Sequence, residues 1–343
     1  MRLPELGPER ARKLRAPPHM ACPFPAHMHP DCEEFENRVL TWMVGHRLLS
    51  DERQGYAGHS NRPPPGRLMG WLYPYGRAEA VVTGAQMAVW ARMLDDRIAD
   101  PAAHRQDLAE MAGRMLAFDS ILHDSDAVFD RPDEPSEEIL RDLCRRIRAM
   151  TTPDQWLRTQ QAVLRAFLGF TADAAHASGN KLPTVARYRS IRRNTSTLDI
   201  FIVLAEVAAG FEVPPAAALR REVQMLVDTT TDLFTMAHDI FTCHKDVHHV
   251  DWLNFAILLA HEHARTPQGG LELAVEEFGN GTDRFHALSE TLLDSFDHAP
   301  WARHLIRALE HVLGGYLAWL SELWITEAGD YDFGLVPLLG AAT

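Results

Sequence analysis

Apolar residues recur at three- and four-residue spacing over most of the chain, which is the period of an amphipathic helix. The pattern covers residues 31–50, 78–98, 103–123, 135–150, 154–177, 184–210, 215–249, 251–264, 283–293 and 301–327. Short links rich in Pro, Gly, Asp or Asn separate these segments, for example TTPD at 151–154 and FEVPP at 211–215. The pattern therefore predicts an almost wholly helical chain with hardly any strand.

Two proline-rich stretches lie near the N-terminus. Residues 1–30 show little periodicity and are predicted to form an irregular arm, and NRPPPG at 61–66 is a second cluster of helix breakers. From about residue 77 onward no linker divides the helical region. One all-α domain of about ten helices, residues 31–343, is the simplest prediction.

Composition narrows the function classes. The chain has 343 residues, of which 46% are hydrophobic, and a formal net charge of −13, which disfavours a nucleic-acid partner. The cysteines (Cys22, Cys32, Cys144 and Cys243) form no CxxC pair and indicate reduced thiols. No segment resembles a signal peptide, and no apolar run approaches the roughly 18 residues that cross a bilayer. A cytoplasmic protein without a membrane partner is expected.

The stretch VWARMLDDRIAD at 89–100 is the first candidate site. An apolar helix face ends there in Asp95 and Asp96, and Asp100 lies four residues after Asp96 on the same side. Adjacent carboxylates repel each other and gain nothing from a helix C-terminus, whose dipole favours cations. Two explanations stay open at this point. The carboxylates are either fully solvated or bind a cation such as Mg²⁺, which prefers hard oxygen ligands.

The stretch HDIFTCHKD at 238–246 is the second candidate site. His238, Thr242 and Asp246 are four residues apart and spread over only about 80° of a helix. This is the layout of a metal site, but imidazole nitrogen and hard oxygens make a mixed donor set for Mg²⁺. Asp239, beside His238, is a further oxygen donor.

Upstream, Arg192 and Arg193 precede an almost uncharged helical segment. Paired arginines of this kind are usually surface anchors, and they also suit phosphate oxygens, which a guanidinium binds through two parallel hydrogen bonds.

Several motifs in this order resemble bacterial class I terpene synthases. They are CPFP and the following HP at 22–30, WLYPYGRAE at 71–79, DDRIAD, RRNTS, and the KD at 245–246 with Asp251 and Asn254 behind it. Each motif alone is weak, but together they run in order from Cys22 to about Phe333. The resemblance implies a single-domain helical bundle around an apolar cavity, with two metal motifs at its mouth. It also implies three Mg²⁺ ions, for which Mn²⁺ is a substitute.

The resemblance assigns roles to both candidate sites. Asp95 is expected to bind metal, with Asp96 and Asp100 in support. The second motif fits HDIFTCHKD better than the earlier TDLFTMAHD, because only the later register contains Lys245 and lies at the family's usual distance from Arg192. The expected second set of metal ligands is His238, Asp239, Thr242 and Asp246.

The second motif departs from the family pattern. His238 replaces Asn, Thr242 replaces Ser, and Asp246 replaces a Glu that is one methylene longer. Histidine is the anomaly for Mg²⁺, and Asp239 is an alternative oxygen donor. The late Arg-Tyr pair of the family is Asp330 and Tyr331 here, which removes one cation. The expected diphosphate contacts are Arg192, Arg193, Lys245 and Tyr331.

Aromatic and small residues are expected to line the cavity: Trp90, Ala91, Phe201 and Trp319. Trp319 is favoured as a catalytic residue beside Asp95, Arg192 and Lys245, because GGYLAWLSE is similar to the family's Gly-x-x-x-Trp segment. Aromatics at helical spacing are more often ordinary core. The position of Ala91 is often occupied by an aromatic residue in farnesyl-using relatives. A small residue there leaves room for a longer substrate, so both farnesyl and geranylgeranyl diphosphate stay open as substrates.

The resemblance predicts a lyase that ionises a prenyl diphosphate, releases diphosphate and cyclises the allylic cation to a sesquiterpene or diterpene. One alternative is an impaired paralogue that only binds a prenyl ligand, and another is a chain-elongating prenyltransferase, which should have a second Asp-rich motif. A zinc site is a third, weak option, because the chain has no HExxH and no cysteine at ligand spacing. A homodimer is left open.

Overall fold

The computed structural model describes Met20 and residues 22–48, 64–95, 108–126, 135–178, 182–249 and 253–325, without the side chains of 135, 177, 178, 244, 245, 247–249 and 323–325. Every regular element in these ranges is a helix, which confirms the predicted all-α fold. The helices are α2 (Cys32–Gly45), α4 (Pro65–Leu72), α5 (Ala78–Leu94), α7 (Leu108–His123), α8 (Pro135–Met150), α9 (Pro153–Ser178), α10 (Val185–Thr195), α11 (Leu198–Ala209), α12 (Pro215–Ala218), α13 (Arg221–His249), α14 (Phe255–Glu262), α15 (Pro267–Ser295) and α16 (Pro300–Ile325).

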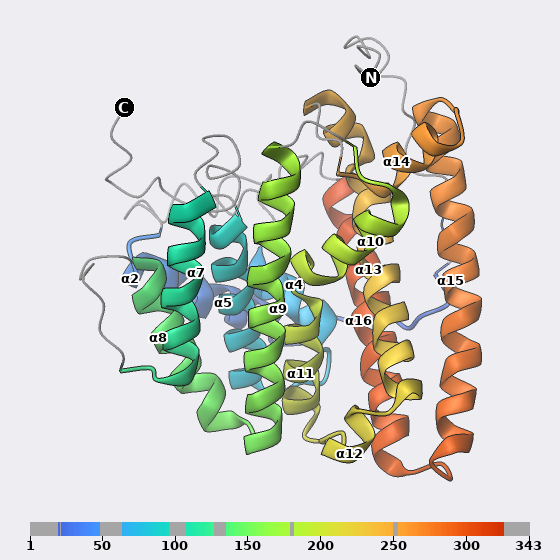
Figure 1. Cartoon of the computed structure of the whole chain (residues 1–343). Coiled ribbons are helices and arrows are strands. Elements are labelled where there is room, and N and C mark those ends of the chain that lie inside the picture. Colours follow the sequence, from blue (N-terminus) through green and yellow to red (C-terminus); the bar gives the residue numbers. More distant parts are fainter. Residues whose placement is uncertain are drawn as a thin grey trace.

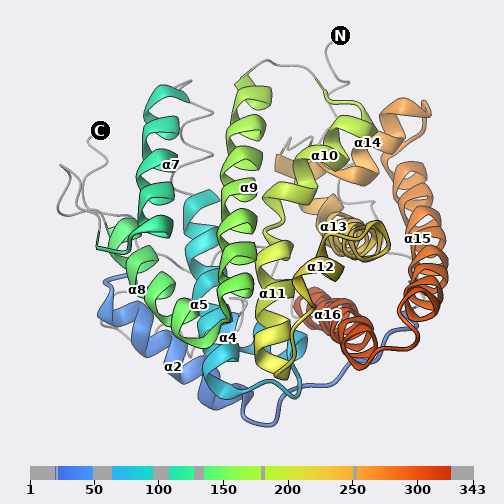
Figure 2. The ribbon, with the colours of Figure 1, turned by 60° about the horizontal axis from the view of Figure 1, so that its bottom comes forward.

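The long helices stand side by side as a bundle (Figures 1 and 2). Helix α13 packs against α15 and α16, α9 packs against α10 and α11, and α5 packs against α4, α8 and α11. The buried side chains join in one cluster that extends from Phe24 to Leu320. A single shared core of this kind is what one domain requires.

Helices α5 and α11 are the innermost elements. Almost every residue of each is buried, so both are apolar all round rather than along one stripe. Such a helix is stable only when neighbours cover most of its faces, and Figure 2 shows α11 between α9 on one side and α13 and α16 on the other. In the part of the chain that the structure describes, no helix is both long and apolar enough to span a bilayer.

Helices α5 and α13 start at the same end of the bundle and run in the same direction. The backbone N–H of Arg77, just before α5, donates to the carbonyl of Ala208 in the last turn of α11 (3.0 Å). Helix α13 follows α11 through the short α12. Asp95 and His238 each lie 17 residues beyond the first residue of their helix, or about 26 Å along it. Both candidate sites are therefore near the same end of the bundle (Figure 1).

The segment 184–210, predicted as one helix, is two helices. Helix α10 ends at Thr195 and α11 begins at Leu198. Thr197 between them has φ +57°, a left-handed conformation that is unfavourable for a residue with a branched side chain. The apolar period continues across this break, so the sequence pattern does not reveal it. The break turns the end of α10, which contains Arg192 and Arg193, toward α13.

Other helices also differ from the predicted boundaries. Residues 215–249 form the short α12 and the long α13, and α2 ends at Gly45 rather than at residue 50. Helix α15 spans Pro267–Ser295 rather than 283–293, because glycines and acidic residues weaken the apolar period in its first half. Helix α4 begins inside the proline cluster, where Pro65 occupies a first-turn position that needs no N–H donor. Gly66 allows α4 to approach α2, because a Cβ there would lie 2.6 Å from the Cα of Glu36.

Residues 22–30, which we call the N-terminal strap, form no helix and tie together elements from both halves of the chain. The ring of Phe24 meets that of Phe285 on α15 edge to face, with centroids 5.2 Å apart. A Cβ on Gly314 of α16 would lie 2.3 Å from the carbonyl oxygen of Pro25. The N–H of His29 donates to the carbonyl of Gly70 on α4 (2.9 Å). The strap therefore contacts α4, α15 and α16.

Candidate active site

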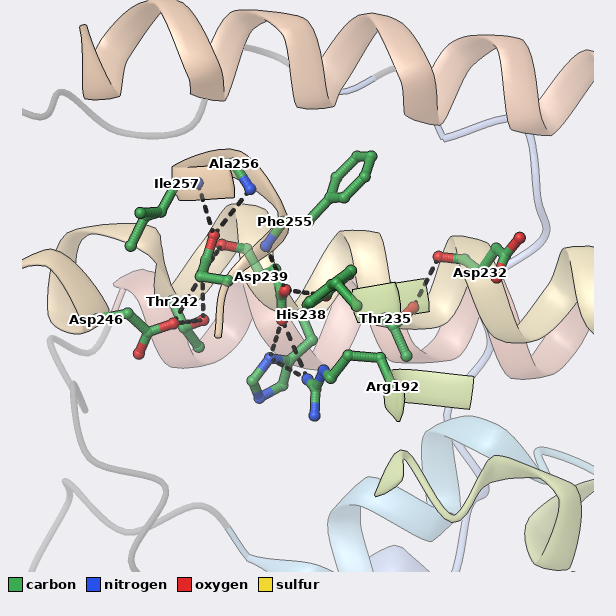
Figure 3. Close-up of polar contacts among 12 residues, drawn as sticks. Arg192, Asp232, Thr235, His238, Asp239, Thr242, Asp246, Phe255, Ala256 and Ile257 are labelled. Atoms are coloured by element: carbon green, nitrogen blue, oxygen red, sulfur yellow. Dashed lines mark hydrogen bonds and ion pairs between the residues drawn. The ribbon is translucent and has the colours of Figure 1, made fainter. Parts of the chain in front are cut away.

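Asp239 is the centre of the polar cluster on α13. Its carboxylate is 1% exposed. Arg192 Nη2 donates to Oδ1 (3.1 Å), and His238 Nδ1 lies 3.0 Å from the same oxygen. The hydroxyl of Tyr188 and the backbone N–H of Phe255 (2.7 Å) donate to Oδ2. Figure 3 shows Arg192 of α10, His238 of α13 and Phe255 of α14 around this carboxylate.

The opposite charges of Arg192 and Asp239 stabilise each other's ionised form. Burial alone raises the pKa of Asp239, but Arg192 and His238 lower it by more, so the net pKa is below its usual range. Burial opposes the charge of Arg192, while Asp239 and Tyr188 favour it, and its pKa is raised. Burial, together with Asp239, raises the pKa of Tyr188 well above its usual value. Asp239 and Arg192 therefore stay ionised, and Tyr188 stays a neutral donor.

Asp239 does not have the surroundings of a metal ligand. Both of its oxygens face donors, and a cation on either would displace Arg192 or two other hydrogen bonds. The structure thus argues against the prediction that Asp239 supplies an oxygen to Mg²⁺. His238 Nδ1 lies between Asp239 Oδ1, which accepts, and Arg192 Nη2, which donates (3.2 Å), so these contacts suit either tautomer. In the tautomer with the proton on Nδ1 the lone pair is on Nε2, the arrangement in which carboxylates orient metal-binding histidines. Asp239 therefore acts through His238 and Arg192.

Thr242 and Asp246 have the geometry of neighbouring metal ligands. The oxygens Thr242 Oγ1 and Asp246 Oδ2 are 2.8 Å apart on one side of α13. Adjacent ligands of an octahedral Mg²⁺, each about 2.1 Å from the ion, are separated by about 3.0 Å. The pair therefore fits a divalent cation. Within the described residues no three side chains of His, Cys, Asp or Glu form a metal-binding group by themselves.

Arg192 and Arg193 have different surroundings. Arg193 donates through Nε and Nη2 to Asp232 (2.7 and 2.8 Å) and through Nη1 to Asp228 (3.0 Å). Those carboxylates occupy both edges of its guanidinium, so a diphosphate contact at Arg193 would have to replace them. Arg192 instead lies beside the metal motif, with Nη2 3.2 Å from His238 Nδ1. Of the two arginines, Arg192 therefore remains the one predicted to contact the diphosphate.

Asp95 occupies the C-cap position of α5. Its carboxylate is 32% exposed and lies 3.4 Å from Arg92 Nη1. It is thus partly accessible at the end of an otherwise buried helix. The other predicted residues of this end (Asp96, Asp100, Tyr331 and the side chain of Lys245) lie outside what the structure describes.

A family model described as the C-terminal metal-binding part of terpene synthase family 2 matches residues 86–284, more than half of the chain. The chain belongs to terpene synthase family 2. The matched span includes both metal motifs and the paired arginines. It therefore confirms the resemblance that the motifs indicated.

Curated relatives of this terpene synthase come from bacteria and fungi. It is 27% identical to a germacradien-6-ol synthase of Streptomyces pratensis over 326 residues, which cover 93% of this chain and 84% of the relative. It is 25% identical to a T-muurolol synthase of Roseiflexus castenholzii, named as cyclising farnesyl diphosphate, over 90% of this chain and 92% of the relative.

Solved structures show the same fold. Germacradien-4-ol synthase of Streptomyces citricolor superposes with a TM-score of 0.74 at 22% identity, over 90% of this chain and 99% of that one. The linalool/nerolidol synthase of Streptomyces clavuligerus also gives a TM-score of 0.74, at 19% identity over 88% and 99% of the two chains. The terpene synthase fold therefore extends over nearly the whole of the present chain.

The predicted cavity residues of the terpene synthase are all buried, but they differ in surroundings. Trp90 packs against Phe118 and Phe167 with ring centroids 5.6 and 6.2 Å away, and its indole N–H donates to the Ser136 carbonyl (3.0 Å). Those contacts indicate a core residue between α5, α7 and α9. Ala91 and Phe201 are also buried.

Trp319 belongs to an aromatic row between α13 and α16. Its ring stacks on Tyr316 (centroids 5.7 Å apart), which stacks on Phe234 (3.7 Å). Phe234 lies on α13 one helical turn before His238, so the row begins beside the polar cluster. Burial raises the pKa of Tyr316. Trp319 is thus associated with the candidate site through Tyr316 and Phe234.

Three residues of the site were not indicated by the sequence: Tyr188, Phe234 and Tyr316. Asn254 was noted there only as part of a motif, without a role. Tyr188 precedes Arg192 by one helical turn, a spacing that could have suggested a shared partner. The roles of the others depend on which helices meet, for which the sequence has no local signal.

Proposed function

We propose that this terpene synthase is a Mg²⁺-dependent class I cyclase that ionises farnesyl diphosphate and closes the allylic cation to a sesquiterpene product. The observation that supports this most directly is the meeting of Arg192 with the metal motif, 3.2 Å from Nη2 to His238 Nδ1. A buried, permanently charged guanidinium next to metal-binding side chains suits a diphosphate group, whose oxygens need both kinds of partner.

The residues of the site have distinct proposed roles. Asp95 on α5 and His238, Thr242 and Asp246 on α13 would hold the metal, with three ions expected from the family. Bound Mg²⁺ supplies the positive charge that weakens the carbon–oxygen bond of the substrate. Arg192, oriented by Asp239, binds diphosphate oxygens and stabilises the leaving group. Lys245 is proposed as the second cation of the site.

The substrate proposal follows the relatives. Two bacterial relatives are named as cyclising (2E,6E)-farnesyl diphosphate, the T-muurolol synthase and a 4-epi-cubebol synthase of Streptosporangium roseum. Ala91 is buried and small, which leaves geranylgeranyl diphosphate as the alternative to compare. The two substrates differ by one five-carbon unit, so parallel incubations separate them.

The test is incubation of the purified full chain with Mg²⁺ or Mn²⁺ and the C10, C15 or C20 prenyl diphosphate. We expect release of diphosphate and a cyclic product, identified by mass spectrometry, from the C15 substrate. A longer linear diphosphate would show a prenyltransferase instead. Absence of diphosphate release from all three substrates with either metal would overturn the proposal.

A second test of the proposal is the variant Asp95→Ala. Removing a proposed metal ligand should abolish turnover, while the far-ultraviolet circular dichroism of the helices stays unchanged, because Asp95 lies at a partly exposed helix end. Turnover at the wild-type rate in this variant would show that the metal is bound elsewhere.

A further inference from the structure

Asn254 is completely buried at the junction between α13 and α14. It is the N-cap of α14, and its Oδ1 accepts hydrogen bonds from the N–H groups of Ala256 (2.9 Å) and Ile257 (3.5 Å). An N-cap of this kind satisfies backbone donors that the helix leaves without internal partners. The capping of α14 accounts for the contacts of Oδ1, but not for those of the NH₂ group.

The other end of the amide faces the metal motif. Asn254 Nδ2 donates to Asp246 Oδ2 (2.7 Å) and to the backbone carbonyl of Asp239 (2.8 Å), and it lies 3.5 Å from Thr242 Oγ1. All three neighbours present oxygens, whereas the Oδ1 side meets only N–H groups. This pattern permits a single orientation of the amide, with the NH₂ toward α13.

Asn254 therefore touches both oxygen ligands that the proposed function assigns to α13. Asp246 Oδ2 accepts from Asn254 and from Thr242 at once, and the two ligand oxygens are held 2.8 Å apart. Asp246 has a shorter side chain than the Glu of the family pattern, and α14 supplies a fixed donor to its carboxylate from a rigid, buried position. The donor restricts the rotation of that carboxylate.

We propose that Asn254 is a positioning residue that holds Thr242 and Asp246 in the geometry that binds the divalent cation. This inference rests on the proposed function, because it takes Thr242 and Asp246 as metal ligands. A residue needed only as a cap would not require the NH₂ group, since Ser, Thr and Asp cap helices about as well as Asn. Among these four, Asn alone has an acceptor oxygen and an NH₂ with two donors.

The test separates the two halves of the amide. Asn254→Ser keeps a capping oxygen for α14 and removes the NH₂, and Asn254→Thr does the same with more of the volume filled. Thr266→Ala is the matched control, because Thr266 caps α15 through its hydroxyl (3.1 Å to Gly269 N) and has no described contact with the metal motif. Binding of Mn²⁺ in the presence of inorganic diphosphate is measured by electron paramagnetic resonance, without substrate or turnover.

We expect Asn254→Ser and Asn254→Thr to weaken Mn²⁺ binding about 10- to 100-fold, the usual effect of losing a partner behind a metal ligand. Thr266→Ala should bind Mn²⁺ like the wild type, although it is less stable. The Mg²⁺ concentration that gives half of the maximal rate should rise in the Asn254 variants. Excess Mg²⁺ should restore their rate toward that of the wild type.

Each outcome has one meaning. Wild-type Mn²⁺ affinity in a folded Asn254→Ser or Asn254→Thr variant overturns the positioning role and leaves the proposed function standing. Equal weakening in Thr266→Ala also overturns it, because general loss of stability would then explain the effect. Failure of the wild-type chain itself to bind Mn²⁺ with diphosphate overturns the proposed function and, with it, this inference.

Discussion

Arg192 and Arg193 are adjacent in the chain but face different partners. Arg192 shares Asp239 with Tyr188, His238 and a backbone N–H, at the end of α10 that meets the metal motif. Arg193 is one residue on and therefore about 100° around the helix, where it joins Asp228 and Asp232. We propose the first arginine for the chemistry of the site, whereas the second holds α10 against α13.

The corresponding prediction compares Arg192→Lys with Arg193→Lys. Lysine is a point charge that cannot reproduce a planar pair of hydrogen bonds. We expect Arg192→Lys to lower kcat/KM for the prenyl diphosphate about 100-fold, equivalent to about 2.7 kcal/mol of transition-state stabilisation. Arg193→Lys should leave kcat/KM within about twofold and cost about 1 kcal/mol of unfolding free energy, since its side chain is 36% exposed.

Steady-state kinetics and urea unfolding measure the two quantities on the same preparations. A large loss of kcat/KM in Arg193→Lys with unchanged stability would mean that Arg193, not only Arg192, contacts the diphosphate.

Spacing in the sequence was sufficient to place His238, Thr242 and Asp246 on one side of a helix, because residues four apart share a helix face whatever surrounds them. It could not separate Asp239 from these proposed ligands. The position next to His238 is polar in either case, and only the tertiary contacts from Tyr188 and the Phe255 N–H show that its carboxylate is enclosed.

At the scale of elements, α2 and α4 meet through one carboxylate. Glu36 Oε2 accepts from the N–H groups of Gly66 (2.7 Å) and Arg67 (3.3 Å) at the start of α4, while its Oε1 is buried without a partner. Burial raises the pKa of Glu36 to about 7, against the smaller effect of those N–H groups. The burial of Glu36 therefore destabilises the folded protein most when its carboxylate is ionised.

This predicts a pH dependence of stability. Because the folded-state pKa of about 7 exceeds the usual 4.5, the folded protein binds more protons than the unfolded chain between these values, and stability falls as pH rises through that window. The shift corresponds to about 3 kcal/mol. Glu36→Gln keeps an oxygen for Gly66, and it should unfold at higher urea than the wild type at about pH 8, with little difference at pH 4.5.

Glu34→Gln is the control, because Glu34 is an exposed residue of the same helix. An equal change in the urea midpoint for Glu34→Gln, or no pH dependence of the difference for Glu36→Gln, would contradict a role for the buried carboxylate.

The elements themselves were predictable where apolar periodicity and breakers agreed, as for α8, whose limits match the predicted 135–150. The division between α10 and α11 was not. It depends on a left-handed Thr197, which no local residue preference favours and which the packing of both helices must hold in place.

At the scale of the whole molecule, the N-terminal strap joins the first and last described parts of the chain. Gly314 of α16 has no side chain, and this allows Pro25 to pass directly over the helix. In Gly314→Ala the new Cβ would lie 2.3 Å from the Pro25 carbonyl oxygen, so the strap or the helix must move. We expect a loss of about 2 kcal/mol of unfolding free energy.

Gly279→Ala is the matched control within α15. A Cβ there meets nothing within 4 Å, and alanine favours the helix over glycine by about 0.5–1 kcal/mol. The two Gly→Ala changes should thus have opposite signs in thermal or urea unfolding. A stabilising Gly314→Ala would show that the strap does not press on α16.

The strap also constrains the order of events during synthesis. Pro25 leaves the ribosome long before Gly314, by roughly 15–60 s at ordinary translation rates. Until α15 has emerged, Phe24 lacks its contact with Phe285, and until α16 has emerged the strap lacks the helix that Pro25 passes over. A nascent chain of this protein should therefore depend on holding chaperones until its last helices appear, and truncations near the C-terminus should increase aggregation through a segment almost 300 residues away.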